Sequence, residues 1–223
     1  MVLWITAWGA TALAVPVKDG ERHLEVHPVV APVSVEAQVT AWRKTREVDP
    51  GPLACEPIFK GELRLCWRAF DGTKRRWVHV SDIERWGGSV SGWTATARAD
   101  AAARIHAMTG QEATDGLSYL RASADPRFSA DLVMAPDAAQ AKVASRELRF
   151  AAPQLDVVFA WAASTQEGDV MASVEAAELY ASATLPLSDM AWRWHEGTWV
   201  PWGRAVPARP RATKKGSPNL GDP

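Results

Sequence analysis

The chain has 223 residues, of which 47% are hydrophobic and 23% are charged, and its formal net charge at neutral pH is −1. This is the composition of an ordinary globular protein with enough apolar residues for a substantial core, so folding requires neither a disulfide framework nor a metal. Residues 203–223 carry a charge of +4, which leaves −5 on residues 1–202. An acidic body argues against a nucleic-acid-binding domain, which normally presents a basic face.

Two interpretations fit the N-terminal segment. Residues 1–17 are uncharged, and Ala12-Leu13-Ala14 imitates a signal-peptidase site, but the basic region that opens a signal peptide is missing. Residues 13–17 and 22–26 instead flank an Asp19-Gly20 turn, which predicts a β-hairpin. The uncharged segment of residues 1–17 is also too short to span a bilayer. We expect a cytoplasmic protein without a transmembrane segment; the alternative is export through an atypical signal, residues 1–14.

The two cysteines, Cys55 and Cys66, are too few for a disulfide framework and lack the spacing of a zinc site. In a cytoplasmic protein they are expected to be reduced thiols. Pairing of the two is the alternative if the protein is exported.

The first elements are a helix and a hairpin. Pro28 and Pro32 are expected to bound a loop, after which Ser34 can cap a helix over residues 34–47. Residues 62–70 and 75–80 predict two strands joined by a four-residue loop. This loop length places Trp67 opposite Val78 and Leu65 opposite Val80, and it gathers the apolar side chains on one face. The opposite face then carries Arg64, Arg68 and His79.

Helices and a second hairpin follow. A short helical turn is predicted over residues 83–86, and the alanine-rich residues 93–108 predict a long helix. Residues 117–121 predict a strand, and residues 136–144 predict a helix that begins with proline. The remaining expectations are a hairpin of residues 147–152 and 157–161, a loop over residues 166–169 and a helix over residues 170–182.

Hairpins separated by helices indicate an α+β fold, here antiparallel hairpins packed with three or four helices. We expect a single domain over residues 1–202, with a possible subdivision near residues 110–116. Residues 203–223 have almost nothing to bury, so they are expected to form a disordered basic tail.

The last hairpin holds four of the twelve tryptophans. With Glu196-Gly197 as a two-residue turn, Trp194 faces Trp199 and Trp192 faces Pro201. The three indoles of residues 192, 194 and 199 then share a face, which is expected to pack as core on the helix of residues 170–182. The opposite face carries three side chains that could meet solvent together: Arg193, His195 and Trp202.

Several segments resemble an uncharacterised bacterial family, the YtpQ-like proteins with a domain of unknown function. These segments are Ser81-Asp-Ile-Glu-Arg-Trp-Gly87, Arg149-Phe-Ala-Ala-Pro-Gln-Leu-Asp156, Leu185-Pro-Leu-Ser188 and Trp194-His-Glu-Gly-Thr-Trp199. The resemblance covers residues 65–202, with Leu155 where the family usually has arginine and Glu196-Gly197 where it has aspartate-glycine. It implies a shared fold, but no activity and no catalytic residues.

Motifs for nucleophilic catalysis, phosphate binding and metal coordination are missing from the sequence. We therefore expect a soluble, non-catalytic module without a cofactor or metal that binds another protein, in an oligomeric state that the sequence leaves open. Nucleic acid is not the expected partner, because basic and aromatic residues of strand 75–80 sort partly to opposite faces. The alternative is a hydrolase or transferase with a dispersed site at His195, Asp189 and Glu196. The candidate binding residues are Arg193, His195, Trp202, Trp199, Arg76 and His79.

Overall fold

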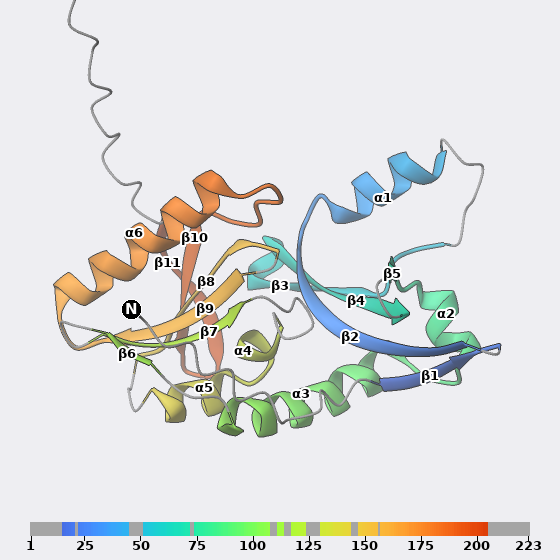
Figure 1. The fold of residues 1–223 in the computed structure, drawn as a ribbon, viewed down its shortest axis with the longest axis horizontal. Coiled ribbons are helices and arrows are strands. Elements are labelled where there is room, and N and C mark those ends of the chain that lie inside the picture. The colour runs from blue at the N-terminus through green and yellow to red at the C-terminus, as the bar shows by residue number, and fades with distance from the viewer. Residues whose placement is uncertain are drawn as a thin grey trace, which may run out of the picture.

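The computed structural model describes residues 15–20, 22–44, 51–71, 74–107, 111–113, 117–123, 130–143, 147–155 and 157–204. This part of the chain folds as a single α+β domain, as the sequence predicts, with a five-stranded and a six-stranded antiparallel sheet. The two sheets lie next to each other in Figure 1, the first on the right and the second on the left. Residues 1–14, which are the signal segment in the alternative interpretation, and the tail from residue 205 onward lie outside the described residues.

The first sheet is built around the long strand β4. Its strands are β1 (Val15–Asp19), β2 (Arg22–Pro32), β3 (Cys55–Ile58), β4 (Leu63–Asp71) and β5 (Lys74–Trp77). β2 pairs along one edge of β4, and β3 and β5 follow each other along the opposite edge. Asp19 pairs with Arg22 at the first turn, which confirms the predicted Asp-Gly hairpin.

The prediction that Pro28 and Pro32 bound a loop is wrong, because both lie within β2. Pro28 pairs with Trp67 of β4. On the other edge of β2, the pairing with β1 covers only the residues from Arg22 to Val26. Beyond Val26, β2 therefore has a free edge among the described strands. A proline is tolerated there because its missing N–H is not needed for a second ladder.

The register predicted for β4 and β5 is confirmed. Arg68 pairs with Trp77, and the N–H of Val78 donates to the carbonyl of Trp67 at 3.0 Å. The predicted pairing of Leu65 with Val80 is wrong, because the chain leaves the sheet at α2 (Val80–Arg85) and Leu65 pairs with Glu56 of β3 instead.

A disulfide joins β3 to β4 and corrects the expectation of reduced cysteines. Cys55 and Cys66 are directly opposite each other in the ladder, with Cα atoms 4.1 Å apart and an S–S bond of 2.06 Å. Cys66 is fully buried in a small cluster with Val35 at the start of α1 (Val35–Lys44), which lies over the outer face of this sheet in Figure 1.

The second sheet has the strand order β11-β10-β8-β9-β7-β6. Its strands are β6 (Gln111–Ala113), β7 (Leu117–Ser123), β8 (Arg149–Gln154), β9 (Val157–Ala163), β10 (Met190–His195) and β11 (Thr198–Arg204). The helix α6 (Gln166–Ser182) packs on β8 and β9. The loop expected over residues 166–169 is instead the first turn of α6, because Thr165 caps it by accepting a hydrogen bond from the N–H of Gly168 at 3.1 Å.

The main core lies between the two sheets and includes side chains from both. Leu63 and Trp67 of the first sheet belong to it, and so do Phe150 and Trp192 of the second. The helices on this side are α3 (Val90–Ala107), α4 (Asp131–Met134) and α5 (Pro136–Lys142). α3 runs along the bottom of Figure 1 beneath both sheets.

The C-terminal hairpin has the predicted register, with Trp194 opposite Trp199 and Trp192 opposite Pro201. The three indoles share one face, but the expectation that this face packs on α6 is wrong. Trp192 instead packs against Phe59 in the main core, with the two rings tilted and their centroids 4.3 Å apart. α6 lies against the other face of the sheet, where small side chains allow a helix to approach: Ala151, Ala172, Ala176 and Ala191.

Candidate functional site

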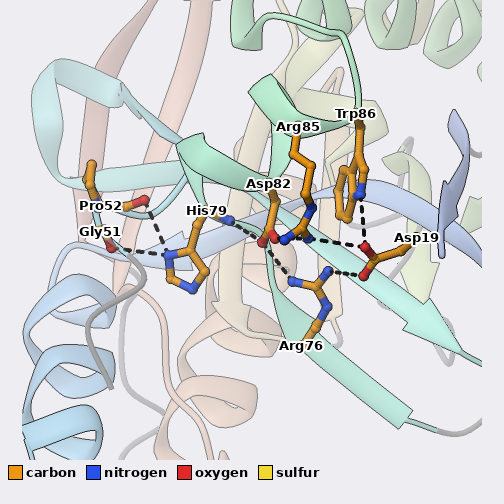
Figure 2. Close-up of polar contacts among 8 residues, drawn as sticks. All are labelled: Asp19, Gly51, Pro52, Arg76, His79, Asp82, Arg85 and Trp86. Carbon is orange, nitrogen blue, oxygen red and sulfur yellow. Dashed lines mark hydrogen bonds and ion pairs between the residues drawn. The ribbon is translucent and has the colours of Figure 1, made fainter. Parts of the chain in front are cut away.

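Charged side chains from β1, β5 and α2 form a compact network, shown in Figure 2. Arg76 donates to Asp82 at 2.7 Å and to Asp19 at 3.2 Å. Arg85 donates to the other oxygen of Asp82 at 2.7 Å and forms an ion pair with Asp19 at 3.2 Å. Two arginines and two aspartates thus neutralise one another, and they tie the first hairpin to α2.

Asp82 is the centre of this network. Burial by itself raises the pKa of its carboxyl group, but the N–H of His79 and the guanidinium groups of Arg76 and Arg85 together lower that pKa below its ordinary value. The N–H of His79 donates to Asp82 at 3.0 Å, which caps the start of α2. Asp82 is therefore ionised at neutral pH and holds the end of β5 against the helix.

The arginine–aspartate network packs against the indole of Trp86, which stacks on that of Trp93. The guanidinium carbon of Arg76 lies 5.2 Å from the ring centroid of Trp86, within cation–π range. Trp86 stacks on Trp93 at 5.9 Å, and Trp93 meets the buried Trp67 edge to face at 5.3 Å. A continuous line of aromatic rings therefore joins the charged network to the main core.

Of the two candidate residues in this region, His79 has a structural position. It is buried, and its Nδ1 lies 3.2 Å and 3.3 Å from the carbonyl oxygens of Gly51 and Pro52. Arg76 has a side chain that is 41% exposed, but both of its terminal nitrogens already bind aspartates. These two residues are close together, but the His79 side chain is buried and the Arg76 side chain is held by the two aspartates.

The outer face of the same hairpin is different, and sequence reasoning missed it. Arg68 lies over the ring of Trp77, with its guanidinium carbon 4.7 Å from the centroid, and Arg75 lies over Phe70 at 5.8 Å. We call these four side chains, Arg68, Phe70, Arg75 and Trp77, the basic face. Basic and aromatic residues were expected to sort partly to opposite faces, and Arg76 does lie on the other face of β5 from Trp77. The pairing of Arg68 with Trp77 and of Phe70 with Arg75 nevertheless puts these four side chains on one side.

Charge is concentrated at the basic face and its edge. Residues 64–76 contain five basic side chains and one acidic side chain, within a body whose net charge is −5. Lys74 and Arg75 are exposed, whereas Arg76 is neutralised by Asp19 and Asp82, and Arg64 lies 4.0 Å from Glu36. The exposed Lys74 and Arg75 therefore make this edge of β5 locally positive on a body of net negative charge, so the edge attracts anionic groups.

The outer face of the C-terminal hairpin forms a second cluster. The ring of Trp202 lies 5.0 Å from the guanidinium carbon of buried Arg149 and meets Trp161 edge to face. Arg149 forms ion pairs with Glu147 at 3.1 Å and Asp169 at 2.9 Å, and the Arg193 side chain is 3.9 Å from Glu147. Arg193 and Trp202 are thus brought together around one carboxylate network, which neutralises the two arginines.

The other two hairpin candidates are separated. His195 is exposed beside the turn, where its Nε2 is 3.8 Å from Glu196. Trp199 lies on the opposite face, partly buried against the core, and its indole N–H donates to the carbonyl of Val133 at 3.4 Å. Trp199 is therefore a packing residue, and His195 reaches solvent without the other candidates.

The dispersed catalytic set does not come together. His195 and Glu196 are neighbours at one end of β10, but Asp189 precedes the other end, six residues away and roughly 20 Å along an extended strand. Asp189 is instead 3.9 Å from Arg204 of β11. These three side chains cannot act on one substrate atom in this arrangement.

No group of three or more metal-ligating side chains is assembled among the described residues. Within the same residues, every helix is too short or too polar to cross a bilayer. Comparison of the chain with protein-family models, with curated proteins and with solved structures found no match.

Proposed function

We propose that this chain is a non-catalytic module that binds another protein, and that the basic face of β4 and β5 is its binding surface. The observation that supports this most is the stacking of Arg68 on Trp77 beside the exposed Arg75. Tryptophan and arginine are the side chains that most often dominate protein–protein binding energy. Stacking also restrains both side chains before binding, which lowers the entropy lost when a partner docks.

The C-terminal hairpin is the weaker candidate surface. Its three-indole face belongs to the core, and the arginines of its outer face are neutralised by Glu147 and Asp169. The catalytic alternative has less support, because His195 and Asp189 lie at opposite ends of β10. The resemblance to the YtpQ-like family remains a proposal about the fold and adds no activity.

The binding proposal is tested by capture from the native host with three forms of the full chain. These are the wild type, Arg75→Glu on β5 and Arg98→Glu on α3, which applies the same charge change to an exposed arginine outside the basic face. We expect a protein that is retained by the wild type and Arg98→Glu but lost by Arg75→Glu, with equal thermal melts. Equal retention by all three forms would exclude the basic face as the surface.

We also propose that the protein works in an oxidising compartment. The Cys55–Cys66 disulfide supports this over the cytoplasm, where thiols are kept reduced. Residues 1–14 are then the candidate signal. The intact mass of the protein from its host tests both points, since the bridge lowers the mass by about 2 Da relative to the free thiols. Free thiols on an uncleaved chain would contradict the proposal.

A further inference from the structure

The outer edge of β5 has main-chain groups that no described strand occupies. Val78 donates to Trp67 of β4, and donors alternate in direction along an antiparallel strand. The N–H and C=O groups of Lys74 and Arg76 therefore point toward β4, and those of Arg75 and Trp77 point to the opposite edge. Among the described strands, β5 pairs with β4 alone.

The side chains at this edge exclude a second copy of the same strand. Lys74, Arg75 and Arg76 are exposed on a strand of four residues. If two such strands paired, like charges would stand opposite or diagonal to each other, which destabilises a ladder. An added strand with acidic side chains meets opposite charges instead.

The two faces of β5 differ in what they offer a partner. On the α2 side, Arg76 is already bound to Asp19 and Asp82. On the basic face, Arg75 and Trp77 lie two residues apart, so an added strand places alternate side chains beside them. A partner therefore gains most from acidic residues at every second position, on the side of the basic face.

We infer that β5 takes up an extended acidic segment of a partner protein as an additional strand of the first sheet. This inference rests on the proposed function and names the partner's chemistry. Main-chain hydrogen bonds to Arg75 and Trp77 supply affinity, and the alternating acidic side chains supply specificity, as in other cases of strand addition. The positive charge of residues 64–76 favours an acidic segment over a neutral one.

The test uses a ten-residue peptide that alternates glutamate with valine, and the same peptide N-methylated at every residue. The second peptide keeps the charge but cannot donate main-chain hydrogen bonds. We expect the first peptide to bind the full chain at least about tenfold more tightly than the second. Binding should weaken by a similar factor in Arg75→Glu and stay unchanged in Arg98→Glu. Amide exchange should slow at Arg75 and Trp77.

Equal affinity for the two peptides would overturn strand addition and leave only charge attraction. A single-stranded oligonucleotide that binds while the peptide does not would overturn the acidic-peptide partner. If the peptide does not bind, but a host protein is captured by the wild type and lost in Arg75→Glu, strand addition is wrong and the proposed binding function is retained. If Arg75→Glu changes neither the binding of the peptide nor the capture of a host protein, both proposals are wrong.

Discussion

Arg104 of α3 donates two hydrogen bonds of 2.7 Å to the carboxylate of Asp131, which is fully buried at the start of α4. Burial by itself lowers the pKa of the Arg104 guanidinium, but the bonds to Asp131 raise it above its ordinary value. Burial raises the pKa of the Asp131 carboxyl group above its ordinary value, because it outweighs the hydrogen bonds and the charge of Arg104, which lower that pKa. The Arg104–Asp131 pair fixes α4 against α3, on the side of the second sheet that faces the main core.

Replacing Asp131 with alanine should strongly destabilise the fold, because it leaves the Arg104 charge buried without its partner. We expect a loss of about 3–5 kcal/mol in the free energy of unfolding, measured by urea denaturation. The double variant Arg104→Met/Asp131→Leu removes both charges and keeps apolar volume, so it should lose less than Asp131→Ala. A double variant that is less stable than Asp131→Ala would show that the ion pair itself, and not the orphaned charge, decides the loss.

Asp82 should make the protein sensitive to acid. Its pKa is lower in the folded chain than in the unfolded chain, so its contribution to stability is fully present above the unfolded pKa of about 3.9. That contribution is lost as the pH falls through the folded pKa. The free energy of unfolding of the wild type minus that of Asp82→Asn should thus be constant above about pH 5 and shrink below about pH 4. A difference that stays constant down to pH 3 would contradict this role.

The registers of the β4–β5 and β10–β11 hairpins could be predicted from the sequence. Alternation of apolar residues and the length of the turn together favour a single pairing of the two strands in each hairpin. The Trp194–Trp199 pair follows from the Glu196-Gly197 turn alone. Which other element a face of the hairpin packs against depends on the whole fold and cannot be read from the hairpin's own sequence. The three-indole face packs against Phe59 and not against α6. The alanines of α6 and β8 let that helix pack on the opposite face of the second sheet.

The contacts of the basic face, in contrast, follow from local pairing. The predicted register already placed Arg68 opposite Trp77, so their stacking could have been inferred from the pairing. The Asp19–Arg76 contact joins residues 57 positions apart and depends on the placement of β1 relative to β5 in the folded sheet. No local pattern of the sequence encodes that placement. The disulfide depends likewise on the position of β3, a strand of four residues without apolar alternation.

The Cys55–Cys66 bridge should stabilise the fold mainly by restricting the unfolded chain. The two cysteines are 11 residues apart, and closing a loop of this length contributes about 3 kcal/mol. The variant Cys55→Ala/Cys66→Ala should therefore unfold at lower urea concentration than the oxidised wild type. Treatment with a reductant should lower the wild type to a similar midpoint and leave the variant unchanged. A reductant effect on the variant would point to a cause other than the bridge.

The two faces of the C-terminal hairpin should respond differently to alanine. Trp192 is fully buried among aromatic rings, so Trp192→Ala should cost about 3–5 kcal/mol in the free energy of unfolding. Trp199→Ala should also lower the melting temperature clearly, because its ring lies 5.5 Å from those of both Phe59 and Phe150. Trp202→Ala should cost less, since this partly exposed ring mainly covers Arg149. A thermal melt of Trp199→Ala that matches the wild type would return this residue to the candidate binding surface.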